Sequence, residues 1–272
     1  MSETFRFREF DIPIDLMMMT GGGPDTFETI SDGHFRSLNR HVGILPHHNI
    51  LEIGCGIGRD AIPLSTYLKE GHYTGVDIIK PSIDWCSSNL VKRNKKFRFV
   101  HFDVKDELHN PSGQIDTTDI KLPVADLSID RIFLFSVFTH MFEMGIVHYL
   151  KEFRRILKPD GLIYATTFLY DDAVLEAARK TNLTRWNLRF EHEVGKGCRI
   201  NNPEAPLGAV AYDMRRWDRM ILAAGLKHAK PLVRGHWSGI APKSDDGQDV
   251  IILAKEKQGA MHFMRRIWSL TQ

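Results

Sequence analysis

The chain has 272 residues, of which 43% are hydrophobic and 26% are charged, and its formal net charge is +2. This length is enough for one domain with an elaboration around a sizeable core. The near-neutral charge gives no dominant field for a nucleic-acid partner, so none is expected. The three cysteines form no C-x-x-C pair, which argues against a disulfide framework and a zinc knuckle. Because no apolar run approaches the roughly 20 residues of a membrane span, we expect a soluble protein, and the separated cysteines favour the reducing cytoplasm. No clustered Asp, Glu and His residues point to a metal, so none is expected.

Residues 1–43 precede the first predicted strand and form an arm followed by a helix. The arm contains the methionines at 17–19 and the loop-forming run Gly21 to Pro24, and a helical apolar pattern extends over residues 25–42. We expect this segment to cap the site; packing of the arm on the core is the alternative. His34, on the helix, is a candidate for substrate contact, against a structural or exposed histidine.

A glycine-rich turn after the first strand organises the chain. An apolar run containing Glu52 ends in glycines at positions 54, 56 and 58, and a predicted helix over 59–70 follows and ends at Gly71. Strand, glycine turn and helix begin a βαβ unit, and glycines let the backbone turn tightly or lie against a ligand. A dinucleotide fingerprint would place its third glycine at position 59, which is Arg59. The spacing therefore disfavours a nicotinamide dehydrogenase.

Acidic residues also follow the next two predicted strands. The strand over 72–77 ends at Asp77, before a predicted helix over 81–93, and the strand over 97–102 is followed by Asp103. Asp77 lies about 20 residues beyond the glycines, where an acidic side chain binds the ribose of an adenosine cofactor; a helix cap is the alternative. Since parallel strands end at one edge of a sheet, these acids are expected at the crevice where such sheets bind ligands.

The second half of the chain alternates strands and helices after a polar loop over 105–121. We predict strands at 131–136, 162–167, 226–233 and 247–253, and helices at 144–157 and 213–224. Residues 168–212 exceed a simple connection and include a predicted hairpin around residues 195–197. We interpret this insertion as a substrate lid.

Several of these segments resemble the class I S-adenosylmethionine-dependent methyltransferases. E-x-G-x-G-x-G from Glu52 to Gly58 resembles motif I, whose turn wraps the amino acid part of the cofactor. R-x-L-K-P-x-G from Arg155 to Gly161 is similar to the family's approach to strand five. S-V-F-T-H from Ser136 to His140 resembles one large bacterial branch of the superfamily.

The resemblance implies an α/β, Rossmann-like fold over residues 44–258, followed by a basic amphipathic tail at 259–272. The sheet would be seven-stranded and mostly parallel, with an antiparallel last strand, helices on both faces and the lid inserted after strand five. The implied cofactor is S-adenosyl-L-methionine, with Asp103 on the adenine amino group, which donates to a carboxylate, or else only a turn aspartate. The implied cofactor residues are Glu52, Gly54, Cys55, Gly56, Gly58, Arg59, Asp77, Ile78, Asp103, Val104 and Ser136.

The loop after strand four passes the sulfonium in this fold, which makes His140 the candidate general base. Orienting the loop is its alternative role. Further candidate substrate contacts are His34, Tyr170, His236 and Trp237. We expect O-methylation of a sugar, glycan or small metabolite. The alternatives are N-methylation of a small amine or protein side chain, and a cofactor-binding protein without turnover. The tail over 259–272 is expected either to touch a membrane surface or partner, or to pack on its own domain.

Overall fold

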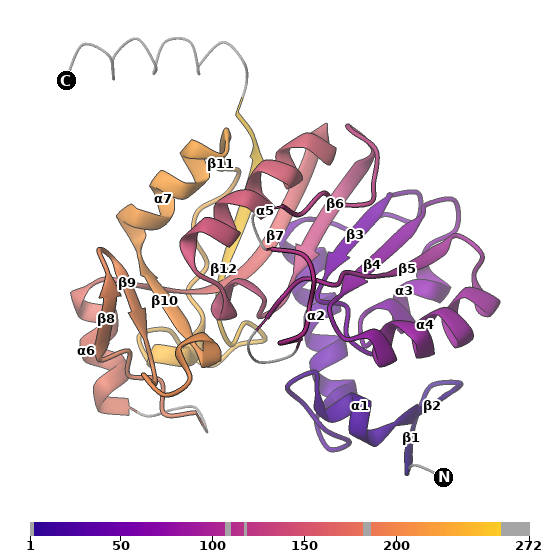
Figure 1. Ribbon diagram of the computed structural model, residues 1–272, viewed down its shortest axis with the longest axis horizontal. Coiled ribbons are helices and arrows are strands. Elements are labelled where there is room, and N and C mark those ends of the chain that lie inside the picture. Colours follow the sequence, from indigo (N-terminus) through magenta and orange to yellow (C-terminus); the bar gives the residue numbers. More distant parts are fainter. Residues whose placement is uncertain (1–2, 107–109, 117–118, 182–185, 257–272) are drawn as a thin grey trace.

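The computed structural model describes residues 3–106, 110–116, 119–181 and 186–256 (Figure 1). The predicted tail at 259–272 lies outside these residues. Before the main sheet, β1 (Thr4–Phe7) and β2 (Phe10–Pro13) pair as an antiparallel hairpin, and α1 (Ile14–Met18) and α2 (Phe27–His41) follow. The helix predicted over 25–42 is confirmed, whereas the hairpin was not predicted.

A central sheet contains all seven predicted strands. Their order is β5 (Phe97–His101), β4 (Tyr73–Asp77), β3 (Ile50–Ile53), β6 (Ile129–Leu134), β7 (Leu157–Tyr170), β12 (Asp249–Lys255) and β11 (Leu226–His228). The first five run parallel, and β12 is antiparallel to β7 and to β11. The mostly parallel sheet with an antiparallel last strand is therefore confirmed.

The strand count differs from the prediction because the insertion adds three strands to this sheet. After α6 (Asp172–Thr181), β8 (His192–Gly195) and β9 (Cys198–Ile200) form the predicted hairpin, and β10 (Val210–Asp213) pairs in parallel with residues 168–170 of β7. The described residues thus form a ten-stranded sheet. Residues 168–170, which were assigned to the insertion, are the end of β7, because this strand continues beyond residue 167 and pairs there with β10.

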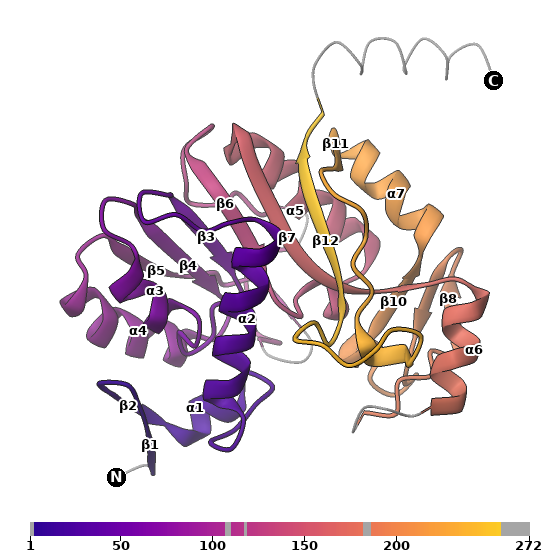
Figure 2. The same ribbon diagram turned by 180° about the vertical axis from the view of Figure 1, so that it is seen from behind.

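Helices cover both faces, as predicted. One core packs under α2, α3 (Ala61–Tyr67) and α4 (Lys80–Arg93), and the other under α5 (Glu143–Ile156) and α7 (Met214–Ala223). Figure 1 shows α5 and α7 in front of the sheet, and Figure 2 shows α2 in front on the opposite face. Alternate side chains of a strand point to opposite faces, so Ile132 and Leu134 enter one core while Phe133 enters the other.

Two of the boundaries that differ from the predicted ones have a clear local reason. Helix α3 stops at Tyr67 because Leu68 is extended and the amide of Lys69 bonds the carbonyl of Pro46. Gly71 is needed for close approach rather than as a helix stop: an added Cβ would lie 2.0 Å from the carbonyl oxygen of His48. Strand β11 ends at His228 rather than at residue 233, because Pro231, with no amide hydrogen to donate, interrupts it.

Among the residues that the structure describes, no helix is both long and apolar enough to cross a bilayer.

Candidate active site

The turn over residues 54–58, here called the glycine turn, follows β3 at the carboxyl edge of the sheet. Gly54, Gly56 and Gly58 have φ values of +74°, +50° and +80°, a region that side chains rarely adopt. A Cβ on Gly54 would lie 2.6 Å from Val137, and one on Gly56 would lie 2.6 Å from the Thr20 methyl. Conformation and space both demand glycine, because neighbouring side chains occupy the room that a Cβ would need.

Asp77 joins the glycine turn to the end of β4. Its Oδ2 accepts the amide of Gly56 at 2.6 Å, and its Oδ1 accepts the amide of Ile79 at 2.8 Å, just before α4 begins. The second bond reaches the amide two residues ahead, as in an Asx turn, and it is not a helix cap, because the N-cap of α4 is Ile79 and has no side-chain cap. The first bond ties the carboxylate to the turn, and the ribose role of Asp77 stays a prediction. Ile78, between them, is half-buried against the core.

Glu52 and Cys55 are buried beside the turn. The Tyr73 hydroxyl donates to Glu52 Oε2. Burial, reinforced by the nearby charges of Asp60 and Asp77, raises the pKa of Glu52 well above its ordinary value. Burial likewise raises the pKa of the Cys55 thiol well above its usual range. Glu52 is therefore suited to hold Tyr73 as a neutral acid, and Cys55 is suited to packing.

Arg59 and Asp60 begin the helix side of the turn and meet α2. Arg59 Nη1 donates to the carbonyl of Thr20 at 3.1 Å, and His34 Nδ1 lies 2.8 Å from Asp60 Oδ2. The His34 ring stacks on Phe135 with centroids 3.5 Å apart and planes 2° apart. Arg59 Nε and Asp60 Oδ1 are buried without a hydrogen-bond partner among the described residues. Such groups are costly in a finished core, so this corner is equipped to receive a polar ligand.

The sequence reasoning missed Asp60 and Phe135. Asp60 comes two residues after the glycine motif and Phe135 directly follows β6, so their positions were a usable signal. The contacts of both residues with His34 could not be predicted, because only the tertiary fold brings α2 next to them.

Asp103 and Val104 lie after β5, farther along the same edge. Asp103 Oδ1 accepts from the Asn110 side chain at 3.0 Å, and its carbonyl accepts the amides of Gln114 and Ile115. Val104 is buried and pairs with Ile115. The structure therefore brings Asp103 to the edge that holds Glu52 and Asp77, each at or beyond the end of its strand.

The loop after β6 is held in a fixed shape by a network that the sequence reasoning did not identify. Ser136 has a φ of +59°, which is strained for a residue with a side chain. Its amide donates to Thr166 Oγ1 at 2.7 Å, and Gln248 Nε2 donates to its Oγ at 2.7 Å. Thr166 in turn donates to Gln248 Oε1 at 2.6 Å. Gln248 lies in the Q-D-V segment before the last strand, but nothing local in the sequence shows that it reaches Ser136.

His140 ends a 3₁₀ turn, η1 (Phe138–His140), and its Nδ1 lies 2.8 Å from the carbonyl oxygen of Leu207. A carbonyl only accepts, so Nδ1 carries the hydrogen, and the lone pair of the neutral ring is on Nε2. Leu207 belongs to the insertion, which thus fixes the tautomer of a side chain on the loop after β6.

The structure groups Tyr170, His236 and Trp237 with the insertion. Trp237 is 3% exposed, its rings pack against Phe168 and Phe190, and its indole donates to Asp249 at 3.0 Å. Arg199 of β9 lies over the Tyr170 ring. His236 accepts a long bond from the Ser244 amide. The surroundings of Trp237 are those of a core residue, and its substrate role stays a prediction.

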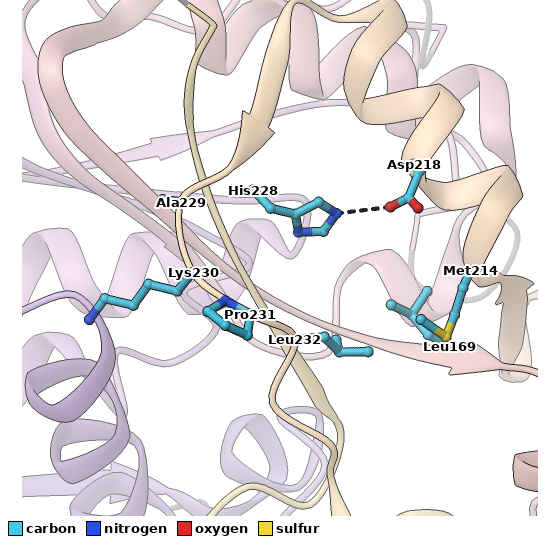
Figure 3. Close-up of a pocket in the computed structure, with 8 residues that line it drawn as sticks. All are labelled: Leu169, Met214, Asp218, His228, Ala229, Lys230, Pro231 and Leu232. Carbon is cyan, nitrogen blue, oxygen red and sulfur yellow. Dashed lines mark hydrogen bonds and ion pairs between the residues drawn. The ribbon is translucent and has the colours of Figure 1, made fainter.

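A surface groove of about 480 Å³ lies between α7 and the segment after β11 (Figure 3). Its polar members include the ion pair between His228 and Asp218, at 2.9 Å. None of the predicted site residues lines it, so the candidate site is the strand edge and not this groove.

Comparison with known proteins gives a family match over part of the chain. Residues 51–163 match the methyltransferase domain family. A sterol 24-C-methyltransferase of Gibberella zeae is 25% identical over 179 residues, which are 64% of this chain and 40% of that protein. An O-methyltransferase of Aspergillus nomiae is 24% identical over 53% of this chain and 58% of its own. The chain thus spans about two fifths to three fifths of the length of these relatives.

Solved structures share the fold at low sequence identity. The 1,6-didemethyltoxoflavin N1-methyltransferase of Burkholderia thailandensis, with bound S-adenosylhomocysteine, is 16% identical with a TM-score of 0.56 over 89% of this chain and 86% of its own. An S-adenosylmethionine-dependent methyltransferase structure from Methanococcus maripaludis is 17% identical with a TM-score of 0.54, over 89% and 93%. Matched segment and sheet together identify, around residues 51–163, the Rossmann-like fold of the S-adenosylmethionine-dependent methyltransferases.

Proposed function

We propose that this chain is an enzyme that transfers the methyl group of S-adenosylmethionine to a hydroxyl oxygen of a sugar, glycan or small metabolite. The observation that carries the methyltransferase assignment is the bond from the Gly56 amide to Asp77. It joins the glycine turn to a buried carboxylate at the carboxyl edge of a parallel sheet. The family match over residues 51–163 supports the same assignment.

The residues at this edge fit such a donor. A Cβ at any glycine of the turn would meet a neighbouring side chain, and of the three only Gly54 is exposed, so its backbone can lie against the ligand. Arg59 Nε and Asp60 Oδ1, a donor and an acceptor without partners, match the carboxylate and ammonium of an amino acid head. Asp77 lies beside the turn at the end of β4, and its carboxylate would accept the two ribose hydroxyls.

The remaining cofactor residues receive supporting roles. Asp103 would accept the adenine amino group, with Ile78 and Val104 as the apolar walls. Glu52 and Cys55 would hold the turn from beneath, and the backbone at Ser136 would face the reacting end. S-adenosylmethionine supplies an activated methyl group on sulfonium; the protein must align the acceptor and remove its proton.

His140 is the residue assigned to that proton. Its bond to Leu207 puts the hydrogen of the neutral ring on Nδ1 and the lone pair on Nε2, which is the tautomer that a general base on this loop would use. A hydroxyl needs a base far more than an amine with its own lone pair does, which favours oxygen as the acceptor atom. The segment after β6 also lacks the D/N-P-P-Y/F motif of base and amide N-methyltransferases. Methylation of a simple amine is the second candidate.

Transfer of labelled methyl from S-adenosylmethionine into a fractionated cell extract tests the proposal. We expect label in the low-mass or glycan fraction. The control variant Asp77→Ala lacks the carboxylate assigned to the ribose hydroxyls and should give no label. Label in protein or nucleic acid would overturn the acceptor class. Donor binding without label in any fraction would favour a binding protein without turnover.

A further inference from the structure

The corner between α2, the glycine turn and β6 adds a histidine, His34, to the two groups assigned above to the amino acid head of the donor. His34 is anchored through Nδ1 to Asp60, and its ring plane is fixed by the Phe135 stack. Its Nε2 has no hydrogen-bond partner among the described residues, and the side chain is 17% exposed. Three polar atoms therefore await partners here: His34 Nε2, Arg59 Nε and Asp60 Oδ1.

The chemistry of these atoms fits a zwitterion in one orientation. The carboxylate oxygen of Asp60 accepts and matches an ammonium group. Arg59 Nε only donates and matches a carboxylate. His34 Nε2 is ambivalent: as a neutral ring bonded to Asp60 through Nδ1–H it presents a lone pair, and only the protonated ring donates from both nitrogens.

We propose that His34 anchors the α-carboxylate of the methyl donor in its protonated form, so that donor binding takes up a proton. The inference rests on the proposed function, and it assigns His34 to the donor instead of the acceptor. Asp60 is the positioning residue: it orients the ring and stabilises the imidazolium, as a carboxylate does in a histidine–aspartate pair.

The charged groups around His34 set the direction of the effect. Burial lowers the pKa of His34 from 6.5; the charge and hydrogen bond of Asp60 oppose this, Arg59 lowers the pKa further, and Asp246 raises it. The ring is therefore mostly neutral at pH 7 before binding. An arriving carboxylate adds a negative charge beside Nε2 and raises the pKa, so a proton enters with the ligand. Between the two pKa values the donor's Kd should rise up to tenfold per pH unit, because each bound ligand requires one proton.

Titration calorimetry with S-adenosylhomocysteine tests this without turnover. Measured near pH 7 in buffers of different ionisation enthalpy, the wild-type protein should take up about 0.5–1 proton per ligand. His34→Gln keeps an N–H donor and cannot titrate, so it should bind with that uptake lost and a flatter pH profile. The ligand's own amino group contributes equally to both proteins, so their difference isolates His34.

Two controls separate this inference from the proposed function. 5′-Methylthioadenosine carries the nucleoside and thioether but no amino acid head, and should bind the wild-type protein without the His34-dependent uptake. His140→Ala should retain the full uptake with S-adenosylhomocysteine. Tight binding with equal uptake in wild type and His34→Gln would overturn the inference and leave the methyltransferase intact; absence of binding to the wild type would overturn both.

Discussion

The glycine turn and the insertion at 168–212 flank the same sheet edge but are built in different ways. The turn owes its shape to backbone: three left-handed glycines within five residues, held by a buried aspartate. The insertion owes its shape to side chains: an aromatic cluster around Phe168, Phe190 and Trp237, and strands added to β7. A site built from backbone suits a ligand that is the same in every reaction of the enzyme. A region built from packed side chains can accept substitutions, and so bind different ligands, without losing the fold. We infer that donor binding resides in the first region and acceptor choice in the second.

The largest expected effect breaks the insertion while sparing the turn. Trp237→Ala empties a fully packed site and leaves Asp249 without the indole donor, so we expect a loss of about 3–5 kcal/mol in the free energy of unfolding. Chemical denaturation measures it. Trp186→Ala, at an exposed tryptophan of the same insertion, is the matched control and should change stability by less than about 0.5 kcal/mol. Equal losses in the two variants would show that the cluster is not the insertion's core.

The next effect tests the point where the two regions meet. His140→Ala should lower kcat by about 10²–10⁴-fold, because the hydroxyl proton loses its acceptor, while the Kd of S-adenosylhomocysteine changes little. Turnover and calorimetry on the same preparation separate these quantities. Unchanged turnover would remove the base assignment, and a large loss of donor affinity would move His140 to the donor's side.

Substitution of Glu52, beside the glycine turn, should change how stability depends on pH. The sign of this change follows from the raised pKa of Glu52. The folded protein holds the Glu52 proton more tightly than the unfolded chain, so this contribution to stability is fully present below the unfolded pKa of about 4.5 and is lost as pH rises toward the folded pKa. The loss is at most about 1.4 kcal/mol per pH unit. Glu52→Gln should remove this decline, so the variant should gain stability relative to wild type between pH 5 and 8. A parallel pH dependence in the two proteins would contradict it.

Sequence reasoning succeeded where a local pattern determined the structure and failed where distant segments meet. The turn at 54–58, the strand-end acids and the seven strands each follow from spacing within about ten residues. The hairpin of β8 and β9 was predicted, but its addition to the main sheet was not, because β10 pairs with β7 across 43 residues and neither segment carries a local pattern that identifies its partner. The bond from Leu207 to His140 and the stack of His34 on Phe135 are hidden for the same reason.

Gln248 is the smallest test and addresses the link between the regions. Its side chain joins Ser136, on the loop after β6, to Thr166 of β7, and so it holds a strained φ of +59° in place. Gln248→Ala should cost about 1 kcal/mol of stability for the lost hydrogen bonds and should lower kcat several-fold as the loop carrying His140 loosens, while donor affinity is retained. Gln114→Ala is the matched control, at an exposed glutamine whose side chain donates to the carbonyl of Ser112 in its own loop. Loss of stability without loss of kcat would show that the loop keeps its shape through Thr166 alone, and that the link is structural and not a support for His140.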